Sequence, residues 1–137
     1  MKYWLEEGAF APKRAHPTDA GLDLRCREET YLWPGHSATF DTGVHIELPE
    51  RCYGKIESKS GLNVNHDIVS CGGVIDEGYT GSICVKLYNL GDKGHLFEVG
   101  DKIAQLVIMP YLAPALELNN DFRETDRGDN GFGSTGR

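Results

Sequence analysis

The chain has 137 residues, of which 39% are hydrophobic and 26% are charged, and its net charge at pH 7 is −7. This length suits about one domain with a real core, and a negative chain is a poor match for nucleic acid, whose binding needs clustered Lys and Arg. The sequence contains no run of roughly eighteen apolar residues that would span a membrane, and its start, MKYWLEEGAF, carries two glutamates where a signal peptide needs an apolar core. We therefore expect a cytoplasmic, intracellular protein with no nucleic-acid or membrane partner.

The cysteines and histidines show no metal-binding spacing. No two of the five histidines form an H-x-x-x-H pair, and C-x-x-C spacing is missing among the four cysteines, which are Cys26, Cys52, Cys71 and Cys84. We expect them to be reduced structural thiols, as is usual inside cells.

Alternation of apolar and polar residues dominates the first half of the chain. Residues 20–26, AGLDLRC, predict a strand in which Asp23 stands between two leucines, and its plainest interpretation is a carboxylate on the solvent face. Residues 52–59, CYGKIESK, predict another strand. Residues 39–48, TFDTGVHIEL, predict a half-buried strand whose inward face carries Phe40, Val44, Ile46 and Leu48.

A short helix is the only helical element that the sequence predicts. Residues 60–67, SGLNVNHD, can hold a turn or so of helix, and Lys59, Ser60 and Gly61 stand where a strand gives way to it. Free backbone N–H groups at a helix start favour anions, but an ordinary helix cap by Ser60 explains the pattern equally well.

A glycine-rich segment follows at residues 71–81, CGGVIDEGYTG. Its two leading glycines permit a tight hairpin that Val74 and Ile75 anchor, with Asp76 at the rim beside Tyr79. A carboxylate at the edge of an apolar hairpin is a candidate general base if a water molecule is held against it. As a turn former, Asp76 needs no function.

Two strands and a polar tail complete the chain. Residues 102–110, KIAQLVIMP, are apolar on both faces, which is typical of a central or interface strand, and Gln105 within them must find a partner or a ligand. We predict a β-barrel domain over residues 1–118 and an arm over residues 119–137. Residues 82–89, SICVKLYN, predict a strand with one apolar face formed by Ile83, Val85 and Leu87.

Five segments, AGLDL, SKSGL, GGVIDEGYTG, GDKIAQL and RGDNGFGSTG, closely resemble in this order the five motifs of the homotrimeric dUTP diphosphatases, or dUTPases. The resemblance covers nearly the whole chain, and its third and fifth motifs are long enough to make chance agreement remote. It implies an all-β, distorted jelly-roll-like barrel with a flexible C-terminal arm. It also implies a homotrimer with shared active sites that hydrolyses dUTP to dUMP and pyrophosphate with the help of Mg²⁺.

The same resemblance assigns roles to individual residues. Asp76 would be the general base for the water that attacks the α-phosphate, Asp23 would act on Mg²⁺ indirectly through water, and Tyr79 would pack under the deoxyribose. Mg²⁺ itself would be held mainly by the substrate phosphates. The barrel residues that would bind substrate are Gly73, Val74 and Ile75 through their backbone at the uracil edge, and Lys59, Ser60, Gly61 and Gln105 at the phosphates.

The tail at residues 127–137, RGDNGFGSTGR, places one aromatic residue in a segment that should not fold alone. Its GFGSTG matches G-x-G-x-x-G, but a dinucleotide site needs a strand before that motif and a helix after it. By resemblance, the arm closes over a neighbouring subunit's site, where Phe132 stacks on the uracil ring. The γ-phosphate would be bound by Arg127, Gly133, Ser134 and Thr135.

Three positions depart from the family pattern. Lys59 and Lys102 stand where arginine is usual, so a planar bidentate donor becomes a point charge. Ser70 stands where many members have asparagine, which shifts uracil recognition toward backbone groups. These departures concern the strength of binding more than the type of reaction.

Two other functions fit the same fold. A dCTP deaminase shares part of the third motif, but it needs a carboxylate on the strand after the hairpin, and SICVKLYN has none. A non-catalytic trimeric regulator that binds protein partners would not need Asp76, Tyr79 and the Phe132 arm, which argues against regulation as the sole role and leaves a second role open.

Overall fold

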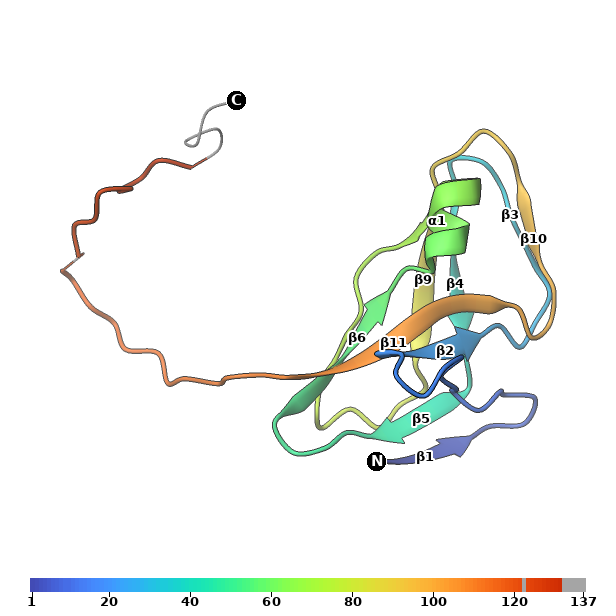
Figure 1. Cartoon of the computed structure of the whole chain (residues 1–137), viewed down its shortest axis with the longest axis horizontal. Coiled ribbons are helices and arrows are strands. Elements are labelled where there is room, and N and C mark those ends of the chain that lie inside the picture. Colours follow the sequence, from blue (N-terminus) through green and yellow to red (C-terminus); the bar gives the residue numbers. More distant parts are fainter. Residues whose placement is uncertain (122, 132–137) are drawn as a thin grey trace.

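The computed structural model describes residues 1–121 and 123–131, and strands make up most of its regular structure (Figure 1). Within this part of the chain, no helix is long and apolar enough to cross a membrane. The predicted all-β class is confirmed. In chain order the elements are β1 (Lys2–Leu5), β2 (Gly21–Arg25), β3 (Thr30–Leu32), β4 (Ser37–Asp41), β5 (Val44–Glu47), β6 (Cys52–Glu57), α1 (Ser60–His66), β7 (Ile68–Ser70), β8 (Val74–Ile75), β9 (Cys84–Asn89), β10 (His95–Phe97) and β11 (Lys102–Pro110).

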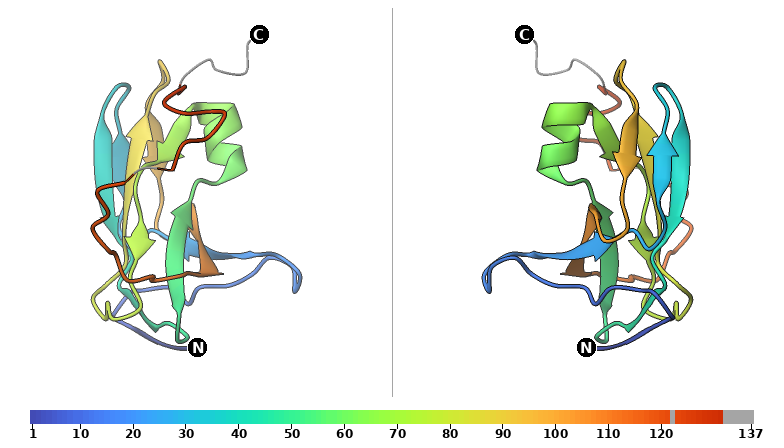
Figure 2. Two further views of the ribbon diagram at one scale, coloured as in Figure 1. Left: turned by 90° about the vertical axis from the view of Figure 1, so that its left-hand side faces the viewer. Right: turned by 90° about the vertical axis from the view of Figure 1, so that its right-hand side faces the viewer.

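Two sheets and two short strand pairs form the barrel. The larger sheet has the order β2-β11-β6-β8 and the smaller one the order β4-β9-β7, while β1 pairs with β5 and β10 with β3. Figure 2 shows these layers from two sides, with α1 at the end of the molecule far from the N-terminus. Strands that follow one another in sequence mostly lie in different sheets, which is the pattern of a jelly-roll-like barrel.

β11 lies at the centre of the larger sheet, as its two apolar faces predicted. It pairs with β2 along one edge and with β6 along the other. Because both edges are occupied, β11 fixes the positions of β2 and β6 relative to each other. Its fully buried residues are Ile103, Ala104 and Leu106.

The strand predicted over residues 39–48 is two strands, which corrects the sequence-based assignment. β4 joins β9, whereas β5 joins β1. Between them Gly43 adopts a left-handed φ of 63°, and Thr42 Oγ1 donates to the Ile83 carbonyl at 2.7 Å, so the chain turns from one sheet into the other. The inward residues are buried as predicted, namely Phe40, Val44, Ile46 and Leu48.

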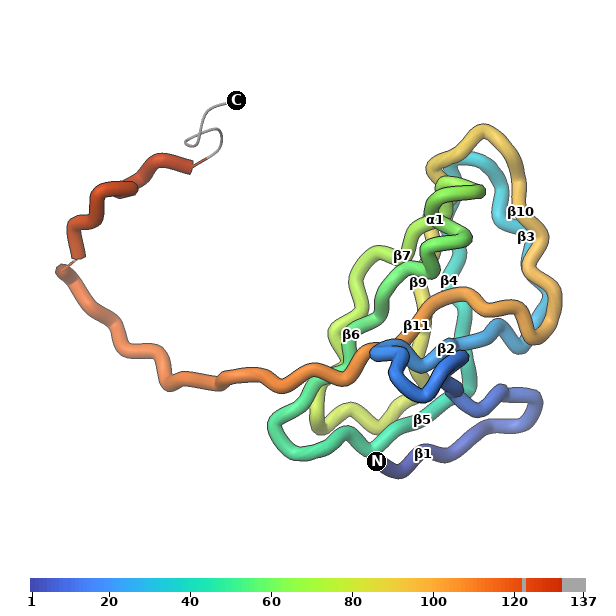
Figure 3. The backbone as a smooth tube through the Cα atoms, in the orientation of Figure 1, coloured from blue at the N-terminus to red at the C-terminus, as the bar shows by residue number. Residues whose placement is uncertain are grey.

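The segment 71–81 connects two sheets and is not the predicted hairpin. β7 before it pairs with β9, whereas β8 within it pairs with β6, and the tube in Figure 3 follows this crossing. Gly72 and Gly73 have φ angles of 86° and 109°, values that favour glycine. Ile75 is buried as expected, but Val74 is 65% exposed, because alternation in a two-residue strand sends one side chain inward and the other outward.

α1 confirms the short helix predicted after β6. It runs from Ser60 to His66, and Asp67 ends it in a left-handed conformation with a φ of 52°. The N-cap residue is Lys59, and Ser60 already lies in the first turn. The alternative that Ser60 caps the helix is therefore wrong.

The chain leaves the barrel after β11 as an extension (Figure 1). At its root, the Tyr111 N–H donates to the Arg51 carbonyl at 3.0 Å. Among the described residues the last strand ends at Pro110, and the predicted boundary between residues 118 and 119 stays a prediction. Beyond the root, exposure between 90% and 97% is found for Leu112, Leu116 and Leu118.

Asn89 is a buried polar residue that the alternation pattern did not reveal. Its Nδ2 donates to the carbonyls of Leu32 at 3.2 Å and Lys93 at 2.8 Å, and its Oδ1 accepts from the Gly91 N–H at 3.0 Å. These bonds tie the end of β9 to the β3–β10 pair.

Replacing Asn89 with leucine should destabilise the fold, because three backbone groups lose their partners while the number and branching of the side-chain heavy atoms stay the same. Each unsatisfied buried group costs about 1–3 kcal/mol, so we expect the free energy of unfolding to fall by at least ~2 kcal/mol. The matched control is Leu90→Asn at the exposed neighbouring position, which should change it by less than ~0.5 kcal/mol. Urea denaturation measures both, and equal stability of the two variants would contradict the role of Asn89.

Candidate active site

Asp23 on β2 lies beneath two lysines and is only 6% exposed. Its Oδ1 contacts Lys59 Nζ at 2.6 Å, and its Oδ2 contacts Lys102 Nζ at 2.7 Å. The solvent-face interpretation is wrong, because the N-terminal segment covers β2 here through a bond from the Asp23 N–H to the Lys13 carbonyl at 2.8 Å. Asp23 thus holds together β2, the start of α1 and the first residue of β11.

The surroundings of the Asp23 carboxyl set its charge. Burial alone raises the pKa of the Asp23 carboxyl, but hydrogen bonds from Lys102 and Lys59 outweigh it and hold the pKa below its ordinary value. Two ammonium groups against one carboxylate leave an excess of one positive charge, which suits an anionic ligand. We refer to this group as the lysine cluster, made up of Asp23, Lys59, Lys102 and Gln105.

Gln105 belongs to the cluster because it is the partner of Asp23 in the β2–β11 ladder. Its Nε2 donates to the Ser58 carbonyl at 3.1 Å, which confirms the expected need for a partner. A Cβ on Gly21 would clash with Gln105 Oε1. Glycine at that position therefore leaves room for the amide.

Ser70 links the lysine cluster to the glycine turn. The Ser70 N–H donates to Ser58 Oγ at 2.8 Å, and the two hydroxyl oxygens lie 3.1 Å apart. Ser70, at the position where the resemblance gives many members an asparagine, is therefore engaged with Ser58. Through it, the segment that leads to Ser60 and the turn at Gly72 are held together.

Asp76 lies on the rim of a pocket at the other end of the sheet. It is exposed, and its carbonyl accepts the Tyr79 N–H at 2.9 Å, which closes a turn after β8. Its carboxylate therefore has open space beside it in which a water molecule can be held. The pocket has a volume of about 430 Å³ and is lined by Tyr53, Val74, Asp76, Glu77, Gly78 and Tyr111.

Glu77 fixes this pocket to the root of the extension. Its Oε2 accepts from the Tyr111 hydroxyl at 2.7 Å and from the Arg51 N–H at 3.0 Å, and the first of these bonds raises the pKa of Tyr111. Sequence reasoning did not single out Glu77, because its partners lie far away in the chain. The only local signal was its place beside Asp76 in a motif.

Tyr79 stands on the same turn with 44% of its surface exposed, so a ligand can reach its ring. Its hydroxyl donates to the Ser82 carbonyl at 3.0 Å. The ring passes over Gly81, where a Cβ would come within 2.5 Å of the phenol oxygen. A side chain at that position would therefore push the ring away.

The backbone of residues 73–75 lies at a sheet edge. β8 has β6 on one side only, so its other row of backbone groups faces away from the sheet. Gly73 anchors the start of this edge, since its carbonyl accepts from the Ile56 N–H at 2.8 Å. A Cβ on Gly73 would lie 2.5 Å from that of Ile56, which explains the glycine.

One chain does not bring all of these groups together. Ile75 pairs with Gly54, so Asp76 comes level with Tyr53 at one end of β6, whereas Lys59 follows the other end. Lys59 is six positions after Tyr53, and at about 3.3 Å per residue the backbones at these two positions lie roughly 20 Å apart along the strand direction. The sheet therefore carries two half-sites, the lysine cluster and the Asp76 pocket.

The arm residues form a third group. Arg127 lies in a turn, where its Nε donates to the Asn130 carbonyl at 3.1 Å and its carbonyl accepts the Asn130 N–H at 3.0 Å. The remaining arm residues with predicted roles lie outside the described residues, and they are Phe132, Gly133, Ser134 and Thr135.

A jelly-roll-like barrel that carries a carboxylate pocket and a cationic cluster on one sheet fits the class of enzyme that the five motifs predict. That class is the nucleoside triphosphate hydrolases. A family model described as dUTPase matches residues 8–136. The chain therefore belongs to the dUTPase family, whose members are dUTP diphosphatases.

Individual relatives are similar to this chain over most or nearly all of its length. The deoxyuridine 5'-triphosphate nucleotidohydrolase of Clostridium novyi (strain NT) is 45% identical over 141 residues and matches 99% of each chain. A solved dUTPase variant of Staphylococcus bacteriophage 80alpha with dUpNHpp has a TM-score of 0.88 at 31% identity, covering 99% of this chain and 98% of its own. A solved structure of a dUTPase variant from phage phi11 of S. aureus has a TM-score of 0.83 at 29% identity, and the match covers 90% of this chain and 98% of its own. That structure concerns the coordination of a structural Mg(II) ion. The predicted jelly-roll-like fold is confirmed.

Asp23→Asn tests the lysine cluster. A depressed pKa means that the Asp23 carboxylate stabilises the fold above the pKa of the unfolded chain, and that this contribution is lost as pH falls through the folded pKa, below about 4. At pH 7 we expect the variant to lose roughly 1–3 kcal/mol of stability, because two ammonium groups lose a charged acceptor. Its stability should also decline less than that of the wild type between about pH 5 and pH 2.

Urea denaturation over this pH range checks both expectations. Asp92→Asn is the matched control, since that aspartate is exposed and should keep the wild-type profile. If Asp23→Asn also kept the wild-type profile, the pairing with the lysines would carry no weight in stability.

Proposed function

We propose that this chain hydrolyses dUTP to dUMP and pyrophosphate with Asp76 as the general base, at a site that several chains share. The observation that carries the proposal is the Asp76 carboxylate, which lines an open pocket on the loop that matches the third dUTPase motif. The substrate is supported by the name of the Clostridium novyi relative and by the dUpNHpp in the phage 80alpha structure.

In the proposed reaction, Asp76 holds and deprotonates the attacking water. A bond forms between the water oxygen and the α-phosphorus, and the bond from that phosphorus to the α,β-bridging oxygen breaks. Pyrophosphate leaves with the electron pair, and the water's proton passes to the Asp76 carboxylate. The turn closed by the Tyr79 N–H fixes the backbone of this base while its carboxylate faces the pocket.

The lysine cluster would bind the triphosphate. Lys59 and Lys102 carry an excess of positive charge over Asp23, and they are already drawn together before substrate arrives. Ser60 and Gly61 would add backbone N–H groups from the first turn of α1, which have no acceptor within the helix itself. Lysine acts as a point charge, so it tolerates several phosphate orientations where arginine would favour one.

A magnesium ion would be shared with the substrate. Among the residues that the structure describes, no three His, Cys, Asp or Glu side chains gather to hold a metal, and both Asp23 oxygens already contact lysines. This donor set fits Mg²⁺ held mainly by phosphate oxygens, with Asp23 reached through water. Such an ion would neutralise phosphate charge.

Gln105 would turn its amide toward the α-phosphate.

The β8 edge and Tyr79 would select the nucleoside. The backbone of residues 73–75 offers donors and acceptors to the uracil edge. The Tyr79 ring would pack under the deoxyribose, where a 2′-hydroxyl would meet an aromatic face. Burying such an uncompensated hydroxyl costs roughly 1–3 kcal/mol, which favours dUTP over UTP.

The two half-sites favour a homotrimer with shared sites. They lie roughly 20 Å apart along β6 in one chain, too far for one substrate to reach the Asp76 carboxylate and the Lys59 ammonium of the same subunit. Symmetric assembly would place the lysine cluster of one chain beside the Asp76 pocket of a second. The arm would then close the site with Arg127, Phe132, Gly133, Ser134 and Thr135.

A pyrophosphate-release assay tests the function. We expect turnover of dUTP that depends on Mg²⁺, and UTP, dCTP and dTTP should each be at least ~10²-fold less efficient in kcat/KM. Deamination of dCTP would favour the rival family, although β9 presents Cys84, Lys86 and Tyr88 where that chemistry needs a carboxylate. Equal turnover of all four nucleotides would contradict selective dUTP hydrolysis.

Asp76→Asn tests the base. We expect kcat to fall by at least ~10²-fold, the low end of general-base effects, with KM nearly unchanged, because the amide cannot accept the water's proton. Steady-state kinetics measures this, with circular dichroism as a check on the fold. Near-wild-type turnover would rule out Asp76 as the base.

Complementation tests the shared site. A chain that ends at Asp126 should form the same oligomer as the full chain but lose turnover. Mixing it with the inactive Asp76→Asn chain should restore part of the activity, since a hybrid trimer can combine one chain's base with another chain's arm. Sedimentation and kinetics read out both, and the failure of every mixture would argue for sites contained within single chains.

A further inference from the structure

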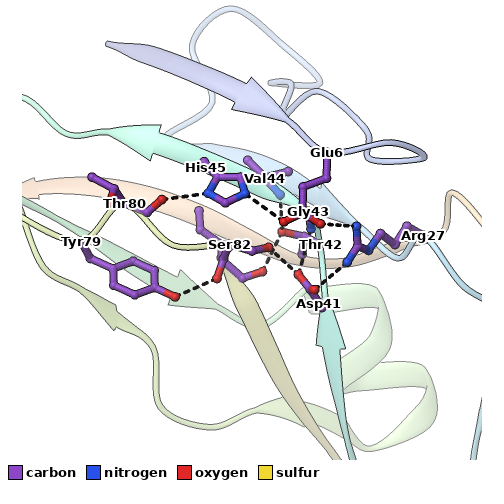
Figure 4. A network of polar contacts seen from close by, with 11 residues as sticks. Glu6, Arg27, Asp41, Thr42, Gly43, Val44, His45, Tyr79, Thr80 and Ser82 are labelled. Atoms are coloured by element: carbon purple, nitrogen blue, oxygen red, sulfur yellow. Dashed lines mark hydrogen bonds and ion pairs between the residues drawn. The ribbon is translucent and has the colours of Figure 1, made fainter.

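Tyr79 is held by contacts that the proposed reaction does not use (Figure 4). Its hydroxyl donates to the Ser82 carbonyl at 3.0 Å, and the hydroxyl of that serine donates to Asp41. The carbonyl of the next residue, Thr80, contacts His45 Nδ1 at 2.8 Å. The turn that carries the ring is therefore fixed at two points.

Further contacts join these two points into one network. Arg27 donates to Glu6 and to Asp41, both at 2.6 Å, and His45 Nε2 contacts Glu6 at 3.1 Å. The residues come from segments far apart in the sequence, and they converge behind the tyrosine turn (Figure 4). We call this set the histidine network, made up of Glu6, Arg27, Asp41, His45 and Ser82.

His45 lies between two hydrogen-bond acceptors. The Thr80 carbonyl and the Glu6 carboxylate both need a donor, but a neutral imidazole has only one N–H. Only the imidazolium satisfies both contacts at once. The ring of Trp4 stacks on His45 with centroids 5.2 Å apart and planes 13° apart, an arrangement that favours a cation.

The neighbouring charges favour the same form. The hydrogen bond to the Thr80 carbonyl raises the pKa of His45 first, followed by the bond to Glu6, and Asp41 adds to the effect. A raised pKa means that the two contacts are complete at low pH and are lost as pH rises through the folded pKa.

Other titratable groups face the network from each packed segment. Arg27 is the opposing cation, but it is paired with both carboxylates, and its bond to Glu6, with that from His45, lowers the pKa of Glu6. Burial raises the pKa of Cys84 on the adjacent β9. The turn itself carries one of these titratable side chains, that of Tyr79.

We propose that His45, as an imidazolium, is a positioning residue for Tyr79 and thereby a determinant of the discrimination between deoxyribose and ribose. This rests on the proposed function, in which the Tyr79 ring excludes a 2′-hydroxyl. The ring lies over Gly81, and the bond from its hydroxyl to the Ser82 carbonyl ties it to the turn. Loss of a donor at the Thr80 carbonyl frees the turn, and the Tyr79 ring then makes room for the 2′-hydroxyl of a ribose.

Deprotonation of His45 removes one of its two contacts in either tautomer, and the charged Glu6 acceptor favours the tautomer with the proton on Nε2, which leaves the Thr80 carbonyl without a donor. With the proton on Nδ1, the Nε2 lone pair faces the Glu6 carboxylate, and with the proton on Nε2, the Nδ1 lone pair faces the Thr80 carbonyl. In both cases one contact becomes repulsive. Sugar selectivity should therefore weaken as pH rises.

The test is the ratio of kcat/KM for dUTP to kcat/KM for UTP, measured from about pH 6 to pH 9. Titration of the general base and of the phosphates affects both substrates alike and cancels in this ratio. We expect the wild-type ratio to fall by at least ~3-fold across the His45 titration, the order expected for the loss of one hydrogen bond. NMR of the His45 ring locates that titration independently of turnover.

Four variants sharpen the test. His45→Ala should have a low ratio that does not change with pH, while Tyr79→Ala sets the ratio reached when the ring is gone. Glu6→Gln keeps an acceptor but removes a charge, so the midpoint should move to lower pH. The matched control is His36→Ala, an exposed histidine that contacts the Pro34 carbonyl within its own turn and should keep the wild-type profile.

The outcomes separate this proposal from the proposed function. If Tyr79→Ala lowers the ratio but His45→Ala and Glu6→Gln match the wild type, the role of His45 is overturned and the sugar contact stands. If Tyr79→Ala also leaves the ratio unchanged, the sugar is read elsewhere and both assignments fail. If the wild type does not hydrolyse dUTP, the proposed function fails, and the role of His45 fails with it.

Discussion

The proposed phosphate site depends on one buried carboxylate between two ammonium groups. Lys59 and Lys102 contact the same carboxylate and would repel each other without it, so Asp23 cancels that repulsion before any substrate arrives. The same contact joins the covered strand β2 to the start of α1 and the start of β11. A single interaction therefore sets both the shape of this half-site and its charge, and binding need not first assemble the cations.

The order of strands in the larger sheet explains why the proposed site is divided within one chain. β6 leads to Lys59 of the lysine cluster at one end and lies beside the Asp76 loop at the other, and a hydrogen-bonded sheet cannot fold back to bring its two ends together. Both halves are nevertheless held firmly, by β11 in the first case and by Glu77 in the second. Rotational symmetry between identical chains is the simplest way to join two such rigid halves.

Much of the fold was predictable because a strand's period is local. β9 and β11 follow their apolar patterns, but the break at Gly43 stayed hidden, since the alternation of buried residues continues across it. The motifs led to Asp76 and to the lysine positions. The burial of Asp23 and the engagement of Glu77 were not predictable, because each depends on partners that only the tertiary fold brings close.

The leucines of the extension have a consequence for how the protein behaves on dilution. Leu112, Leu116 and Leu118 are almost wholly exposed in a single chain, and water is a poor environment for three such side chains on one short segment. If a neighbouring chain covered them in the proposed homotrimer, folding and association would become one coupled equilibrium. The midpoint of thermal unfolding would then rise with protein concentration. In enzyme diluted to assay levels, the extension would lose its contacts as the subunits dissociate.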